Sequence, residues 1–236
     1  MGARSKGGYF RRMASTAMAA GIVAMTLQAA PGLAQVNQYA AGIAAGKVTA
    51  TSPRDFNGVW TTDRFIPRFS ENPPFQPWAK AKFEGYKPQD DPGARCLPTG
   101  WPRHLASPYP FEFIQMPTFT LMYFEVGNQI RRIWTDGRKH PEDLDPSWYG
   151  HSIGWWEGDV FVVDTIGIND KQFLDSPGDP KTEKLHTIER WQLLEGGAKI
   201  QVEITIDDPG AYTAPFSQTR TFFKTGEEVM EYICNE

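Results

Sequence analysis

The sequence predicts an all-β protein whose short antiparallel strands close into a barrel. From Phe111 onward, short runs rich in β-branched and aromatic residues alternate with turn-forming residues. Three turns, at Gly127-Asn128, Glu157-Gly158 and Gly196-Gly197, carry the glycine that a tight hairpin needs. About nine or ten strands in roughly 180 residues fit a single sandwich or barrel, so we expect one domain over 56–236.

The segment 1–34 is typical of a secretory signal peptide. Four basic residues lead into an apolar run over Met13–Leu27, and the small residues Gly32 and Ala34 favour cleavage after Ala34. The alternative is an uncleaved N-terminal anchor. We expect a periplasmic or secreted protein, with residues 35–55 as a flexible arm because they are rich in Ala, Gly, Thr and Ser.

The charge of the chain argues against nucleic acid as a partner. The sequence has 24 basic and 28 acidic residues, and because four of the basic residues lie in the leader, the remainder carries a net charge of −8. An acidic chain without a basic run binds the phosphates of nucleic acid poorly. No apolar stretch after the leader is long enough to span a membrane. The oligomeric state stays open.

The first part of the domain is rich in proline, and its opening favours a barrel over a sandwich. Ten prolines over 67–110 predict an ordered loop, and Pro77 favours one short helix over 78–86. Gly58-Val59-Trp60 resembles the Gly-x-Trp opening of lipocalins. That resemblance implies a lipocalin-like, calycin-type barrel. We expect the segments 220–223 and 229–234 to be its closing strands.

The sequence has two cysteines, Cys96 and Cys234. An even count in an exported protein predicts a disulfide, which here ties the proline-rich loop to the last strand. Two separate thiols or a redox pair are the alternatives, and the second of these is disfavoured because the spacing is unlike Cys-x-x-Cys.

The second hairpin predicts a histidine–carboxylate pair. A Glu157-Gly158 turn puts His151 opposite Asp164, whereas a Gly158-Asp159 turn puts His151 opposite Ile166 and loses the pair. Glycine at the second turn position favours the first register. A carboxylate beside an imidazole fixes its tautomer and raises its basicity, as acid–base catalysis requires. The alternative is a structural hydrogen bond.

The other two hairpins place charged residues on faces that should be apolar. The Gly196-Gly197 turn leaves Glu189 on the core face, and a buried carboxylate must be paired, protonated or functional. The first hairpin turns either Arg131 or Arg132 inward. We expect the inward arginine to pair with Glu189 or to hold an anionic group of a substrate.

A loop over 136–151 concentrates charge, histidines and turn formers, which is typical of catalytic loops. His140, His151 and His186 together could ligate zinc, although their spacing matches no metal motif. We expect no organic cofactor, because the sequence has no phosphate loop and no dinucleotide fingerprint. His104, in the proline-rich loop, is expected at the surface.

Several motifs resemble those of a family of exported bacterial proteins of unassigned function. They are Cys96-x-Pro98-x-Gly100-x-Pro102-Arg103, Asp136-Gly137-Arg138-x-His140-Pro141, Pro146-Ser147-x-x-Gly150-His151-Ser152-Ile153-Gly154-x-Trp156-Glu157-Gly158-Asp159, Val162-Val163-Asp164-Thr165, Glu183-x-Leu185-His186-x-x-Glu189-Arg190 and Thr205-Ile206-x-Asp208-Pro209-x-x-Tyr212. The resemblance implies a shared polar site and names no reaction. Where that family has Pro-His-Ser-Glu, this chain has Pro180-Lys181-Thr182-Glu183.

The leading hypothesis is a lyase, isomerase or dehydratase that acts without a cofactor on a small hydrophobic or aromatic molecule in a barrel cavity. The candidate catalytic residues are His140, His151, Asp136, Asp164 and Glu189. The candidate substrate-binding residues are Arg131, Arg132, Arg138, Tyr123, Trp134, Trp155 and Trp191. The alternatives are a lipocalin-like carrier of an apolar ligand and a metal-assisted hydrolase.

Overall fold

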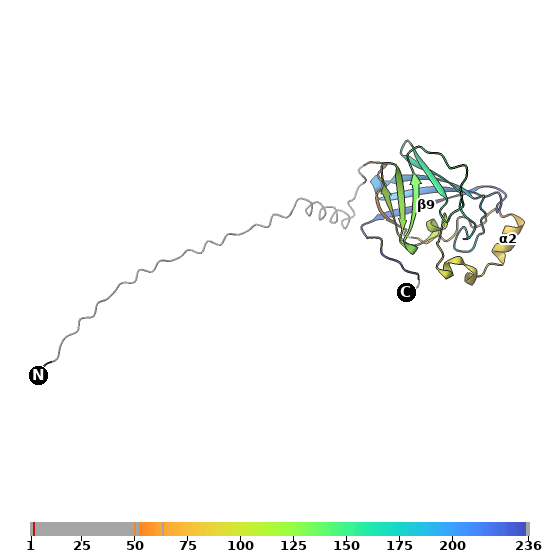
Figure 1. The fold of residues 1–236 in the computed structure, drawn as a ribbon, viewed down its shortest axis with the longest axis horizontal. Coiled ribbons are helices and arrows are strands. Elements are labelled where there is room, and N and C mark those ends of the chain that lie inside the picture. The colour runs from red at the N-terminus through yellow and green to blue at the C-terminus, as the bar shows by residue number, and fades with distance from the viewer. Residues whose placement is uncertain (1, 3–49, 51, 63, 235–236) are drawn as a thin grey trace.

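The computed structural model describes residues 2, 50, 52–62 and 64–234 (Figure 1). The predicted signal peptide, its cleavage site and most of the predicted arm lie outside the described residues. Within the described ranges, no helix combines the length and apolar character that crossing a membrane requires.

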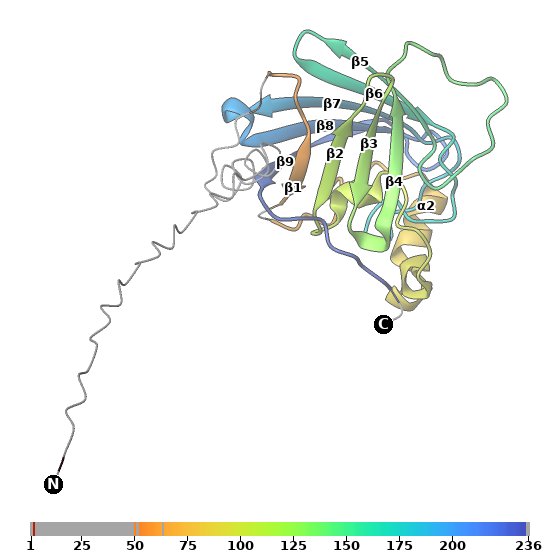
Figure 2. The same ribbon diagram turned by 60° about the vertical axis from the view of Figure 1, so that its left-hand side comes forward.

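Nine strands form a closed barrel, which confirms the predicted all-β class (Figure 2). Strand β1 closes the barrel by pairing with both β2 and β9, and the architecture is consistent with a lipocalin-like barrel. Every pair of neighbours is antiparallel except β4 and β5, which run parallel. The strands are β1 (Gly58–Thr61), β2 (Phe111–Gln115), β3 (Phe119–Phe124), β4 (Gln129–Trp134), β5 (His151–Glu157), β6 (Val160–Ile166), β7 (His186–Leu194), β8 (Lys199–Asp207) and β9 (Phe216–Thr225).

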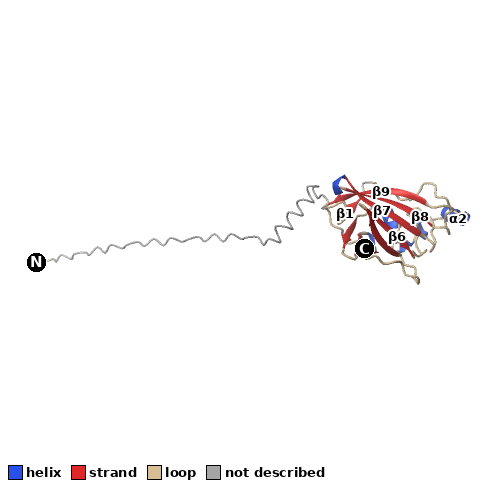
Figure 3. Ribbon diagram, turned by 90° about the horizontal axis from the view of Figure 1, so that it is seen from above, coloured by secondary structure: helices blue, strands red, loops and turns tan. Residues whose placement is uncertain are grey.

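One short α-helix accompanies the barrel among the described residues, as the sequence predicts. Helix α2 (Pro77–Glu84) begins at Pro77, whose fixed φ suits the first turn of a helix, and it lies at one end of the barrel (Figure 3). The remaining helical turns are the 3-10 segments η1 (Pro88–Asp90), η2 (Pro92–Arg95), η3 (Arg103–Ala106), η4 (Val126–Asn128) and η5 (Glu195–Gly197).

Large side chains fill the interior of the barrel. The alternation along each strand sends one row of residues inward, and most of that row is apolar and aromatic. The largest fully buried side chains include Trp60, Trp101, Trp191, Phe56, Phe111, Phe113, Phe161 and Arg131. They occupy the space in which the sequence hypothesis places a ligand, so a site for small molecules would lie outside the barrel core.

The three hairpins differ in how well the sequence predicts their register. Leu193 pairs with Ile200, as predicted, because the longer turn at η5 keeps the same pairing. In the first hairpin Phe124 pairs with Gln129, a shift of two residues that leaves every side chain on its predicted face. Because a shift of two residues preserves the alternation of faces, Arg131 points inward.

The register of the second hairpin is the alternative one. Glu157 pairs with Val160, so that the turn is Gly158-Asp159 and His151 stands opposite Ile166. Gly158 occupies the first turn position with φ of 61°, a conformation that glycine adopts without strain. The preference for glycine at the second position was therefore the wrong criterion, and the predicted cross-strand pair of His151 with Asp164 is not formed.

The C-terminal segment is the other departure from the predicted elements. Residues 229–234 form no strand, although the predicted disulfide between Cys96 and Cys234 is present and holds this segment against the proline-rich loop. His104 is 3% exposed rather than at the surface, because its ring stacks on Phe124 at a centroid distance of 4.2 Å.

Candidate functional site

Three histidines and one aspartate gather on the outer face of the barrel wall. His151, Asp164 and His186 come from the neighbouring strands β5, β6 and β7, and their side chains point away from the core. Asp164 pairs across the strands with Ile153 and Ile188, so each histidine is its diagonal neighbour, within reach of a long side chain.

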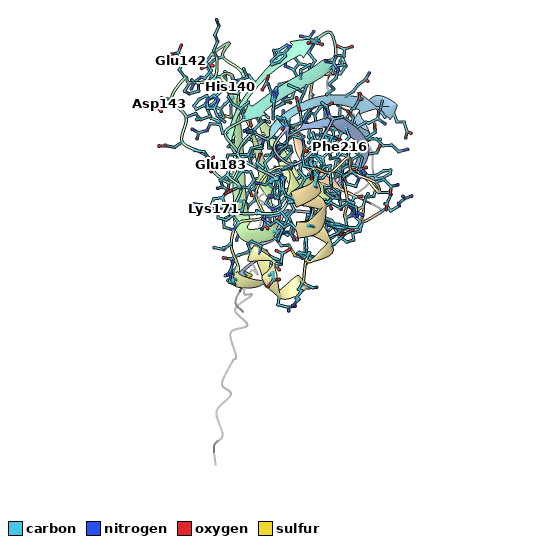
Figure 4. The ribbon with its side chains drawn as sticks, turned by 90° about the vertical axis from the view of Figure 1, so that its right-hand side faces the viewer. His140, Glu142, Asp143, Lys171, Glu183 and Phe216 are labelled. Carbon is cyan, nitrogen blue, oxygen red and sulfur yellow. A yellow bond between two sulfur atoms is a disulfide. The ribbon has the colours of Figure 1, made fainter. Side chains whose placement is uncertain are left out.

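His140 completes this cluster from the loop over 135–150, which also carries Glu142 and Asp143 (Figure 4). The loop is needed because parallel strands cannot be joined by a tight turn, and it brings His140 against the outer faces of β5 and β6. Its far end is anchored where the Ser147 amide donates to the Gly167 carbonyl and the Ser147 carbonyl accepts from Asn169.

Hydrogen bonds join the four side chains, and two of the three histidines share one aspartate oxygen. His140 Nε2 lies 3.1 Å from Asp164 Oδ1, and His186 Nε2 lies 2.9 Å from the same oxygen. The other ring nitrogen of His140, Nδ1, lies 2.8 Å from His151 Nδ1. Asp164, His140 and His151 thus form a continuous chain, and His186 branches from its first member.

The direction of these hydrogen bonds follows from the chemistry of the aspartate. An ionised carboxylate only accepts, so His140 donates from Nε2, and a neutral His140 then accepts at Nδ1 from the Nδ1–H of His151. The lone pair of His151 is left on Nε2, which has no hydrogen-bond partner among the described residues. When His151 takes up a proton at Nε2, it can pass its Nδ1 proton to His140.

The shifted pKa values suit this arrangement. Burial works to raise the pKa of Asp164, but the hydrogen bonds from His186 and His140 outweigh it and lower that pKa. The hydrogen bond to Asp164 raises the pKa of His186. Burial, followed by charge repulsion from His140 when that ring is protonated and from Arg138, lowers the pKa of His151, so that the neutral form of its ring is favoured.

An open groove of about 600 Å³ reaches His151 from the side of β4. Strands β4 and β5 share only the pairs of Ile133 with Ser152 and Trp134 with Ile153, and below these pairs they separate. The groove is lined by Gln129, Ile130, Arg132, Trp134, Ser147, Trp148, Tyr149, Gly150, His151 and Ser152. The volume lies in the range of small-molecule sites.

The predicted substrate-binding residues divide among the groove, the core and the far surface. Arg132 and Trp134 line the groove. Arg138 stacks over Trp134, with its guanidinium carbon 3.5 Å from the ring centroid, and pairs with Asp136. Asp136 is therefore occupied by Arg138, and Asp164 alone of the two predicted aspartates orients the histidines.

Arg131 and Glu189 form an ion pair inside the barrel, on the opposite face of the wall from the histidines. Both side chains are fully buried, and the Arg131 guanidinium contacts both carboxylate oxygens, at 2.6 Å and 2.9 Å. It also donates to Ser152 and Thr165 and lies 3.5 Å from the centroid of Trp101. The inward arginine therefore pairs with Glu189, which is one of its two predicted roles, and the ion pair belongs to the core.

The remaining aromatic candidates lie apart from the groove. Trp191 is buried in the core and donates from its indole nitrogen to Glu189. Trp155 is 41% exposed and donates to Glu157, near the turn at the far end of β5. The Tyr123 hydroxyl donates to Asn128 on the outside of β3.

His186 also belongs to the cluster, although the sequence named it only as a possible zinc ligand and not among the catalytic residues. It stands opposite Asp207 on the outer face of β7. The signal lay in the second hairpin, since the Gly158-Asp159 turn places Asp164 diagonal to both His151 and His186.

No set of three or more His, Cys, Asp or Glu side chains among the described residues has the geometry to hold a metal ion. Neither a protein-family model, nor a curated protein, nor a solved structure matches the chain.

Proposed function

We propose that this protein is an exported enzyme that moves a proton on a small aromatic molecule without an organic cofactor, as an isomerase or lyase does. The observation that carries the proposal is the hydrogen-bonded chain from Asp164 through His140 to His151, which ends at the groove. The resemblance of its motifs to a family of exported proteins supports export, and so does the disulfide, which forms in oxidising compartments.

His151 is the general base of this proposal. Its Nε2 carries the lone pair, and its lowered pKa keeps that lone pair available near neutral pH. The proton it accepts is shared along the chain, because His140 can receive the Nδ1 proton while the Asp164 carboxylate stabilises the cation that forms. His140 and Asp164 are positioning residues, since neither lines the groove.

The experiment follows hydrogen exchange on two probes, phenylpyruvate and its methyl ester. Each has a phenyl ring and an acidic C–H next to a carbonyl group. Incubation of the protein in D₂O at pD 7 replaces this hydrogen by deuterium when a base removes it, and proton NMR measures the rate above that of buffer. We expect faster exchange than in buffer for at least one probe, and a loss of about 100-fold or more in His151→Gln.

A matched control separates the base from its surroundings. His186→Gln removes a histidine of the same cluster but leaves the chain of Asp164, His140 and His151 intact. We expect its exchange rate to stay within about 3-fold of the unsubstituted protein, because a residue outside the proton chain does not take part in the transfer. Exchange at the rate of buffer for both probes, or full exchange in His151→Gln, contradicts the proposal. Binding of the probes without exchange would favour the carrier alternative.

A further inference from the structure

We infer that the groove selects small aromatic carboxylates, and that Arg132 binds the carboxylate while His151 faces the neighbouring C–H. This inference rests on the proposed function, because it names the class of substrate on which His151 acts. It follows from the register of the barrel wall, the unused hydrogen-bond donors of Arg132, the aromatic lining and the charge of the groove.

The register places Arg132 and His151 on either side of the groove. The two observed pairs of β4 and β5 can be extended by one residue toward the start of both strands. The parallel ladder would then put Arg132 opposite His151, with both side chains on the outer face. The strands separate at this point, and both residues line the opening. A ligand lying across the gap therefore meets a cation on one side and a base on the other.

Arg132 has its hydrogen-bonding capacity free. The side chain is exposed and lies against the rings of Phe119 and Trp134, each with its centroid 5.0 Å from the guanidinium carbon, and those two rings meet edge to face with their centroids 5.9 Å apart. It makes no ion pair and no hydrogen bond to any described residue, whereas Arg131, Arg138 and Arg190 are each paired with a carboxylate. A guanidinium without a protein partner presents its N–H groups in a planar fork, which suits a planar carboxylate.

The lining around Arg132 is aromatic and carries no acidic side chain. Trp134 and Trp148 are half-buried, and Ile130 is 57% exposed, so a flat apolar body finds walls to pack on. None of the lining residues is Asp or Glu, although the chain as a whole has a net charge of −4. The groove is thus a locally positive opening on an acidic protein, which favours an anion.

Proton transfer on such a ligand needs no further reactant. In an aromatic keto acid such as phenylpyruvate, His151 Nε2 takes the proton from the carbon next to the keto group, the electron pair of the C–H bond forms the C=C bond of an enolate, and the keto oxygen takes the negative charge. Return of a proton to that carbon restores the keto form, and return to the oxygen gives the enol. No electron leaves the ligand in either case.

The test compares phenylpyruvate with its methyl ester, which differ in one negative charge. Dissociation constants come from quenching of tryptophan fluorescence, and exchange rates come from proton NMR in D₂O. We expect the unsubstituted protein to bind the acid at least about 10-fold more tightly than the ester, because hydrogen bonds to a charged group are stronger than those to a neutral one. Arg132→Gln should weaken binding of the acid about 10-fold or more and binding of the ester less than about 3-fold, and Arg132→Lys should restore part of the loss.

Arg190→Gln is the matched control, since Arg190 is also an outward arginine but lies outside the groove and pairs with Glu157. It should leave both constants unchanged, and circular dichroism should show that all three variants keep the fold. Equal affinity for acid and ester, or equal weakening of both in Arg132→Gln, overturns the inference. Exchange without preference for the acid would overturn it while the proposed function stands, and selective binding without exchange would support it while the proposed function fails.

Discussion

The ion pair between Arg131 and Glu189 leads to a quantitative prediction about stability. In Glu189→Leu the guanidinium stays buried without its counter-ion, which costs about 3–5 kcal/mol. The indole of Trp191 also loses its acceptor, which adds about 1 kcal/mol. The expected loss of about 4–6 kcal/mol is a large share of the 5–15 kcal/mol typical of a domain. For a domain of this size it lowers the melting temperature by about 8 to 24 °C.

The assay is thermal and urea unfolding, followed by circular dichroism and tryptophan fluorescence. The double variant Arg131→Met with Glu189→Leu removes both charges, and the hydroxyls of Ser152 and Thr165 still bond to each other at 2.9 Å. It should therefore be more stable than the single variant by at least about 2 kcal/mol. The same double variant should keep its exchange activity, because the ion pair lies on the inner face of the wall.

Two results would refute this reasoning. A loss of less than about 1 kcal/mol in Glu189→Leu would mean that the carboxylate is not a necessary partner of the buried guanidinium. A double variant that folds as stably as the unsubstituted protein but has lost exchange activity would return Glu189 to the catalytic set in which the sequence hypothesis placed it.

Three further predictions concern the cluster, the disulfide and the loop. Asp164 raises the folded-state pKa of His186, so the stabilisation is present at low pH and is lost as pH rises through the raised pKa. His186→Gln should therefore lower the free energy of unfolding by up to about 1 kcal/mol at pH 5.5 and by less at pH 8. An equal loss at both pH values in urea unfolding would contradict this. Replacing Cys96 and Cys234 by serine opens a loop with a sequence separation of 138 and should lower the free energy of unfolding by about 5 kcal/mol, and an unchanged urea midpoint would argue against it. Gly150→Ala should cost about 1–3 kcal/mol and reduce exchange at His151, since φ is 66° and the new Cβ would stand 2.4 Å from a backbone oxygen of β6; unchanged stability would show that the loop adapts.

Alternation along the strands explains why much of the core was predictable. Glu189 was assigned to the inner face from the period of two alone, together with one of the two arginines Arg131 and Arg132, and a shift of two residues in the first hairpin left the alternation of faces intact. The disulfide followed from the cysteine count, and the helix followed from Pro77. None of these depends on where a strand lies relative to distant parts of the chain.

The histidine cluster was only partly predictable, because a one-residue difference in a turn decides which side chains meet. With the turn at Gly158-Asp159, the expected cross-strand pair of His151 with Asp164 gave way to a chain that passes through His140. His140 belongs to a loop without periodicity, so its position depends on the parallel pairing of β4 with β5. That pairing is non-local, and no short-range pattern in the sequence reports it.

By itself, the amino-acid sequence determined the barrel class, the inward position of Glu189, the disulfide and the set of polar residues from which a site is built. The physical reason is that side-chain alternation, turn chemistry and burial of apolar surface act over short distances along the chain. Only the tertiary structure decided that the interior is filled and that the histidines meet outside the wall, beside a groove that Arg132 also lines. Packing volume and the separation of β4 from β5 depend on contacts across the whole barrel, and these exist only once it has closed.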